Sequence, residues 1–232
     1  MRARGLLALC LLLAGCAGAP PTPLVPTGPL QGRLEHGTYH DMRDWFGVAS
    51  PIAPEDPDYP TLAVNEEYEA HISFATFVLT RAPGEFYRAY VEDFAGGGHA
   101  VPGLDGVADA AVNLFGGQEA KQRAEPVRFV AERRWQAGKT YGLLRLYTER
   151  APIEPLLANL GMGEDYTAYM LMYVTVQGGK VGMLWAEWPG DCKPCTPLQP
   201  GPATASQDPI DQALAANGRA APFMASFRFG KD

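Results

Sequence analysis

The sequence predicts an α+β fold in which an antiparallel β-sheet is flanked by helices. Apolar residues alternate along residues 67–81, 127–148 and 166–188, which is typical of strands, and turn residues separate the runs at short intervals. Helical spacing of apolar residues occurs in separate stretches outside these runs. A hydrophobic fraction of 47% over 232 residues is ample for a core, so a single globular domain at 33–232 is expected.

The strands of this sheet are predicted from alternation and from turns. Residues 67–81 carry β-branched and aromatic side chains on both faces, which favours one central strand covered on both sides. The run at 127–148 is broken by a turn at residues 137–139. The run at 166–188 contains Gly178-Gly179, and a Gly-Gly pair between two apolar runs is a strong hairpin signal. Two successive antiparallel hairpins are therefore expected.

Three helices are predicted outside these runs. Residues 85–95 place aromatic side chains at four-residue spacing with charged residues between them, which predicts an amphipathic helix. A second helix near 105–115 is expected to begin at Asp105 as its N-cap residue. The third, near 209–217, follows Asp208, which is suited to an N-cap, and has a proline at its first position.

Three short stretches occur in the order found in one known family. They are an opening strand pair, Gly37-Thr-Tyr-His-Asp41 with Phe46-Gly-Val48; a helix closing on a double glycine, Asp109-Ala-Ala-Val-Asn-Leu-Phe-Gly-Gly117; and a helix-to-strand ending, Phe223-Met-Ala-Ser-Phe-Arg-Phe229. Over most of residues 33–230 the chain thus resembles the Mog1/PsbP-like family of bacterial envelope proteins. The resemblance implies an antiparallel sheet flanked by helices, no catalytic residues, and a role as a small binding or assembly factor.

The first sixteen residues are organised as a signal peptide. Two arginines precede an apolar run at 6–13, which is far shorter than the roughly 20 residues needed to span a bilayer. The run ends in Leu13-Ala14-Gly15-Cys16, which resembles the lipobox of bacterial lipoprotein precursors at every position. The resemblance implies that residues 1–15 are removed and that Cys16 is lipidated. The alternative is an ordinary secretory peptide cut near Ala19.

The segment at 16–32 is interpreted as the lipidated cysteine followed by a tether. Residues 17–31 hold five prolines and no charge, so they are expected to form an extended spacer. The membrane is therefore the first expected partner, held through several acyl chains. Ala17 stands where an aspartate would retain a lipoprotein on the inner membrane, which, in a Gram-negative host, favours the outer membrane facing the periplasm.

Charge and motifs exclude several functions. Loss of Arg2 and Arg4 lowers the net charge from −7 by two, to −9, which argues against nucleic acid as a partner. The chain has no nucleophile elbow, phosphate loop or dinucleotide fingerprint, so no enzyme activity, catalytic residue or cofactor is predicted. His36 and His40 lie four residues apart near Asp41, but surface histidines are the preferred interpretation and no metal ligand is assigned.

Cys192-Lys-Pro-Cys195 is the motif with chemical content. Cys10 leaves with the signal peptide and Cys16 carries lipid, so Cys192 and Cys195 remain as an even pair in an oxidising compartment, and a disulfide that pins a loop is expected. The alternative is a periplasmic thiol–disulfide protein acting through these two residues. Thioredoxin-like enzymes place the first cysteine at a helix N-terminus, whereas this pair lies in a proline-rich stretch at 189–209. A structural zinc site needs four ligands, and there is no second pair.

The last predicted hairpin concentrates aromatic and methionine side chains. Such residues adapt to apolar partners and can form a ligand platform, although core packing explains one face equally well. They are Tyr166, Tyr169, Met170, Met172, Tyr173, Met183, Trp185 and Trp188. The sequence therefore predicts a non-catalytic, membrane-anchored envelope lipoprotein. It would be a binding or assembly factor that contacts an envelope protein or an apolar ligand through its sheet or its loops.

Overall fold

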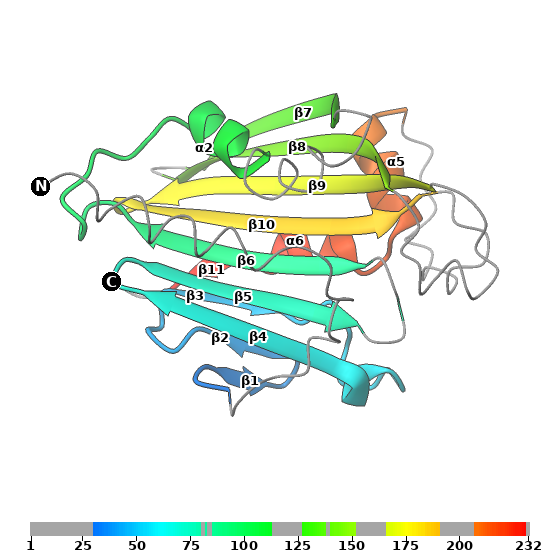
Figure 1. Ribbon diagram of the computed structural model, residues 1–232, viewed down its shortest axis with the longest axis horizontal. Helices are drawn as coiled ribbons and strands as arrows, with labels where there is room; N and C mark the ends of the chain where they lie inside the picture. Colours follow the sequence, from blue (N-terminus) through cyan, green and yellow to red (C-terminus); the bar gives the residue numbers. More distant parts are fainter. Residues whose placement is uncertain are drawn as a thin grey trace, which may run out of the picture.

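A large antiparallel sheet organises the protein. The computed structural model describes residues 30–79, 82, 85–112, 127–137, 140–151, 166–190 and 207–230. The strands of this sheet are β4 (Leu62–Glu69), β5 (Ile72–Leu79), β6 (Phe86–Asp93), β7 (Arg128–Ala137), β8 (Thr140–Ala151), β9 (Tyr166–Gln177) and β10 (Lys180–Pro189). Their order is β4-β5-β6-β10-β9-β8-β7, and every described pairing is antiparallel (Figure 1).

A smaller sheet and short helices complete the fold. The small sheet has the order β1-β2-β3-β11, formed by β1 (Arg33–Glu35), β2 (Thr38–His40), β3 (Phe46–Ala49) and β11 (Arg228–Phe229). The helices are α2 (Leu104–Ala111), α5 (Pro209–Ala216) and α6 (Ala220–Ser226), and a 3-10 turn, η2, spans Tyr59–Thr61. The architecture is α+β and mostly sheet, which confirms the predicted fold class. Among the described residues, no helix has the length and apolarity needed to cross a membrane.

The two faces of the large sheet are covered differently. Helix α2 packs on one face, here called the front face, while the small sheet, α5 and α6 pack on the back face (Figure 1). The core on the back face is built from aromatic rings: Tyr39 meets Phe77 edge to face at 5.6 Å between ring centroids, and Phe77 meets Phe223 at 5.7 Å. These rings connect the small sheet, the large sheet and α6, so the back face is the main hydrophobic core.

Two sequence predictions on the first half of the sheet are wrong. The predicted helix at 85–95 is strand β6, because Tyr87, Ala89 and Val91 alternate with less buried residues at a period of two. Aromatic residues four apart lie on one face of a strand as well as of a helix, so their spacing did not distinguish the two. The single strand predicted at 67–81 is the β4–β5 hairpin, whose strands meet at the pair Glu69 and Ile72.

The remaining elements largely follow the sequence predictions. The hairpins β7–β8 and β9–β10 form in the large sheet, and the strand pair near residues 38–49 forms in the small one. Asp208 caps α5 by accepting a hydrogen bond from the Ile210 amide at 2.8 Å, with Pro209 at the first position. Helix α2 has Gly103 as its N-cap instead of Asp105, which lies in the first turn.

Candidate binding pocket beneath helix α2

Helix α2 is held on the front face by a narrow apolar stripe. Leu104, Ala108 and Ala111 recur at helical spacing and are the buried residues of the helix. They pack on a second apolar cluster, separate from the main core. Its members include Leu143, Met170, Met172, Val174, Val176, Val181, Met183 and Trp185. Two of the three buried side chains, Ala108 and Ala111, are small. The helix therefore does not fill all the space above these strands.

The unfilled space is a cavity of about 210 Å³ between α2, β6 and β10. Its lining is Tyr90, Glu92, Phe94, Pro102, Gly106, Val107, Ala110, Ala111, Val181 and Met183. Gly106 and Ala110 lie on the exposed side of the helix, so the cavity opens there to solvent. Apolar cavities of roughly 150 Å³ hold a group of the size of benzene. This pocket therefore has room for one aromatic ring or a short branched alkyl group.

The polar groups at the pocket wall are Tyr90 and Glu92. The Tyr90 hydroxyl donates a hydrogen bond to Glu92 Oε2. Burial, followed by the hydrogen bond to Glu92, raises the pKa of the Tyr90 phenol, so the ring stays neutral at physiological pH. The lining is therefore mostly apolar, with the Tyr90 hydroxyl and the Glu92 carboxyl group as polar groups at one side. Such a combination suits an apolar group that carries a hydrogen-bond donor near one end.

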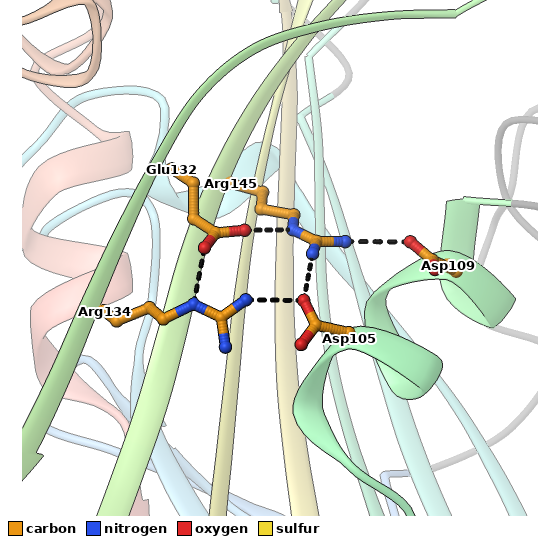
Figure 2. A network of polar contacts seen from close by, with 5 residues as sticks. All are labelled: Asp105, Asp109, Glu132, Arg134 and Arg145. Carbon is orange, nitrogen blue, oxygen red and sulfur yellow. Dashed lines mark hydrogen bonds and ion pairs between the residues drawn. The ribbon is translucent and has the colours of Figure 1, made fainter.

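A network of charged side chains fixes α2 against strands β7 and β8 (Figure 2). Arg145, whose side chain is 11% exposed, donates from Nε to Glu132 and from Nη1 to Asp109, each at 2.8 Å, and from Nη2 to Asp105. Arg134 bridges Glu132 at 2.5 Å and Asp105 at 2.6 Å. The two acids of α2 are thus tied to two arginines of the sheet. Because several charges share one network, the arrangement is more favourable than isolated surface pairs.

The contribution of this network to the stability of the protein should depend on pH. Hydrogen bonds from Arg134 lower the pKa of Asp105 below its usual 3.8, and those from Arg134 and Arg145 lower that of Glu132 below 4.5. A depressed folded pKa contributes stability above the unfolded value, and this contribution is lost as pH falls through the folded value. We expect wild type to unfold at a higher urea concentration than Asp105→Asn at pH 6, and this advantage to shrink as the pH falls below the usual aspartate pKa of 3.8. An unchanged advantage at pH 3 would contradict the assignment.

The sequence-predicted aromatic and methionine platform is divided between the two faces of the sheet. Met170, Met172, Met183 and Trp185 lie under α2 on the front face. Tyr169, Tyr173 and Trp188 belong to the back face, where the buried Trp188 is part of the main core and the tyrosines pack against it. The side chain of Tyr166 lies outside the described part. The prediction therefore included one residue of the pocket lining, Met183, together with core residues that do not line it.

The other residues singled out in the sequence do not meet at this pocket. His36 has a positive φ of 49° in the turn between β1 and β2, whereas His40 pairs with Arg33 inside β2, so the two are not neighbours on one strand face. Within the described ranges, no group of three or more His, Cys, Asp or Glu could hold a metal ion. Cys16, Cys192 and Cys195 lie outside the described residues.

The residues that orient α2 carried a signal that the sequence prediction did not use. Asp105 and Asp109 are four apart, so they share one face of a helix. Glu132 and Arg134 are two apart, so they share one face of a strand. Pairing these two patterns would have indicated where the helix docks. Predicting Asp105 as a cap instead assigned its carboxylate to the backbone of its own helix.

Comparisons with known proteins show similarity at the level of fold. No protein-family model matches the chain, and no curated protein matches it. The solution structure of cyanobacterial PsbP from Synechocystis sp. PCC 6803 is similar at 11% identity, covering 90% of this chain and 99% of that one, with a TM-score of 0.49. The Saccharomyces cerevisiae Ran-binding protein Mog1p is similar at 11% identity, covering 85% and 96%, with a TM-score of 0.41. At these values neither structure assigns an activity or a partner to this chain.

Proposed function

We propose that this chain is a non-catalytic, membrane-anchored envelope lipoprotein that acts as a binding or assembly factor. The observation that supports the binding role is the open apolar pocket beneath α2. A partner would insert one aromatic or branched aliphatic side chain there, or an apolar ligand would occupy it. Binding energy in interfaces concentrates in such anchors, seated in well-packed pockets. The lining methionine Met183 and its neighbour Met172 allow the walls to adapt to the inserted group.

The last residues of the predicted tether are held at strand β4, away from helix α2. The amides of Gln31 and Gly32 donate hydrogen bonds to the Glu66 carboxylate at 2.6 and 2.8 Å, and the Tyr39 hydroxyl donates to it at 2.6 Å. Burial opposes ionisation of Glu66, but these hydrogen bonds prevail and lower its pKa. Glu66 lies on β4, the edge strand at the opposite end of the sheet order from β7 (Figure 1). Residues 31 and 32, at the end of the predicted tether, are therefore held at β4, whereas the α2 pocket lies at β6 and β10.

Replacement of Cys16 by serine tests the anchor. Serine has no thiol to accept a diacylglyceryl group, so Cys16→Ser should abolish labelling by radioactive palmitate in cells and leave unprocessed precursor. Cys10→Ser, which removes a cysteine within the expected signal peptide, is the matched control and should be labelled like wild type. Normal maturation and membrane partitioning of Cys16→Ser would refute the lipoprotein assignment.

Filling the pocket tests the binding role. Ala110→Leu adds apolar atoms at the opening while keeping a good helix former in α2. The leucine side chain would occupy space that a ligand needs, so we expect the variant to bind toluene, which has a single aromatic ring, about tenfold more weakly than wild type in an NMR titration. Ala216→Leu, at an exposed alanine of α5, is the matched control and should bind like wild type. Equal binding by both variants would mean that toluene does not use this pocket.

A further inference from the structure

Among the residues that the structure describes, no strand pairs with the outer edge of β11 in the small sheet. It pairs with β3 through Arg228 with Gly47 and Phe229 with Phe46, and it is the last strand of its sheet. The Gly230 amide also donates to the Trp45 carbonyl at 2.7 Å, on the side of β3. Because antiparallel ladders direct alternate residues to opposite sides, the backbone N–H and C=O of Phe229 point away from β3. An unpaired edge of this kind is a template for another strand.

Two cavities meet at this edge. One, of about 500 Å³, lies on the outer face of the small sheet and is lined by Thr38, His40, Asp44, Phe46, Gly47, Ser226, Arg228, Phe229 and Gly230. The other, of about 300 Å³, lies between β11 and the back face of β7–β9 and is lined by Trp135, Thr140, Tyr173, Thr175, Gln177, Phe227, Arg228 and Phe229. Arg228 and Phe229 belong to both linings. The back face of β7–β9 is therefore open to solvent beside the unpaired edge of β11.

Two glycines of the large sheet leave room for the aromatic rings that line the second cavity. A Cβ at Gly142 would lie 2.5 Å from the Trp135 ring, and a Cβ at Gly182 would lie 2.5 Å from the Phe227 ring. The rings therefore occupy positions next to the sheet backbone that side chains at these two residues would fill. Trp135 stacks on Tyr173 with ring centroids 5.9 Å apart and planes at 7°. Both rings remain partly exposed, so they present apolar area to whatever enters the cleft.

Arg228 gives the edge a positive charge. Its Nη1 donates to the main-chain carbonyls of Ala225 and Phe227 at 2.9 and 2.6 Å. Within the described ranges it forms no ion pair with a carboxylate, and its side chain is exposed. A guanidinium has five N–H donors, so others remain for an incoming acceptor. The protein as a whole carries a net charge of −7, which makes a cation at this one edge selective for a locally acidic segment.

We propose that an extended segment of a partner protein pairs with β11 as a fifth strand of the small sheet. Its side chains would alternate between the two cavities. An aromatic side chain would pack against Trp135 and Tyr173, and the next residue, on the opposite face with Arg228, would be an aspartate or glutamate. Main-chain pairing supplies affinity in this mode of recognition, and the two side-chain sites supply specificity. The site is separate from the α2 pocket and stands whether or not that pocket binds.

A defined peptide tests the proposal on the full-length lipidated protein in detergent micelles. The probe is a fluorescein-labelled heptapeptide of alternating threonine and valine with a central phenylalanine followed by aspartate, measured by fluorescence polarisation. We expect saturable binding that weakens at least tenfold in Arg228→Glu. Exchanging the peptide aspartate for lysine should weaken binding to wild type and restore it to Arg228→Glu. Phenylalanine-to-serine exchange in the peptide should also weaken binding tenfold.

Backbone pairing is tested without altering the protein. Two further peptides are N-methylated at alternate positions, so one loses the N–H groups that face β11 and the other those that face away. We expect the first to lose binding and the second to keep it. Absence of binding at millimolar peptide, or equal binding of both methylated forms, would overturn the proposal. So would loss of binding in Ala110→Leu, which would place the peptide at α2, or dimerisation of the peptide-free chain that Arg228→Glu abolishes.

Discussion

Replacing Arg219 by methionine should lower the free energy of unfolding by about 3–5 kcal/mol. Arg219 Nη1 lies 3.2 Å from Glu85 Oε1, with the two side chains only 7% and 2% exposed. Methionine matches much of the volume of the arginine side chain but removes its charge, so the Glu85 carboxylate is left buried without a counter-ion. An uncompensated buried charge is far more costly than the loss of a surface ion pair.

The residues around Arg219 and Glu85 determine how the destabilisation by Arg219→Met depends on pH. Tyr87 donates to Glu85 at 2.8 Å, and Asn217 donates to Tyr87 at 2.9 Å, which connects strand β6 with the α5–α6 turn. Burial raises the pKa of Glu85, and the hydrogen bond from Tyr87 and the charge of Arg219 oppose the rise. Without Arg219 the folded pKa rises further above the unfolded value, so the folded state binds the proton more tightly. The destabilisation should therefore be full above the folded pKa and shrink as pH falls through it.

Urea unfolding followed by tryptophan fluorescence measures both effects. Glu85→Gln combined with Arg219→Met should be less destabilised than Arg219→Met alone, because a neutral amide replaces the stranded carboxylate. Arg33→Met is the control, since Arg33 forms exposed ion pairs with Glu35 and Asp44, and it should change stability by less than about 0.5 kcal/mol. A loss below about 1 kcal/mol in Arg219→Met at pH 7 would show that the pair is not what stabilises this turn.

The sequence predicted the long hairpins well because their signals are local. Gly178 and Gly179 both have positive φ, 59° and 83°, as a two-residue turn between antiparallel strands demands. Asp208 and Pro209 likewise start α5 through contacts within a few residues. The misassigned strand β6 lacked such a signal, since its neighbours β5 and β10 come from residues 72–79 and 180–189 and were not visible to a local pattern. Tertiary pairing decided its conformation.

The candidate site was foreseen only in part for a similar reason. The composition of the last hairpin identified Met183 and Trp185 as members of an aromatic and methionine platform, but not which face they share or what covers it. The pocket exists because α2 presents Gly106 and Ala110 near β6 and β10, which is a mismatch of side-chain volume between distant segments. The buried pair of Arg219 and Glu85 joins residues 134 apart in sequence, and no spacing rule relates them. Sequence periodicity predicts which residues share one face of a strand or helix. Cavities and buried ion pairs depend on which of these faces pack against each other in the fold.

Replacing Phe223 by alanine should also destabilise the protein by about 3–5 kcal/mol. Phe223 is fully buried in α6 and meets two rings of the large sheet edge to face, Phe77 at 5.7 Å and Tyr87 at 5.3 Å between centroids. Alanine would remove the ring that seats α6 on the back face and leave a cavity between the helix and β5–β6. Because rigid strands surround the site, the cavity cannot collapse fully, and the cost should be near the upper end of the range.

Two companion variants separate packing at this site from a general effect of losing an aromatic residue. Phe223→Leu retains most of the apolar volume and should cost about half as much as the alanine variant. Phe129→Ala removes a ring that is 58% exposed on β7 and should change stability by less than about 0.5 kcal/mol. Urea midpoints with unchanged slopes would give the three values directly. If Phe223→Ala were no more destabilised than Phe129→Ala, α6 would contribute little to the core, and β11, which follows it directly, would be held by β3 alone.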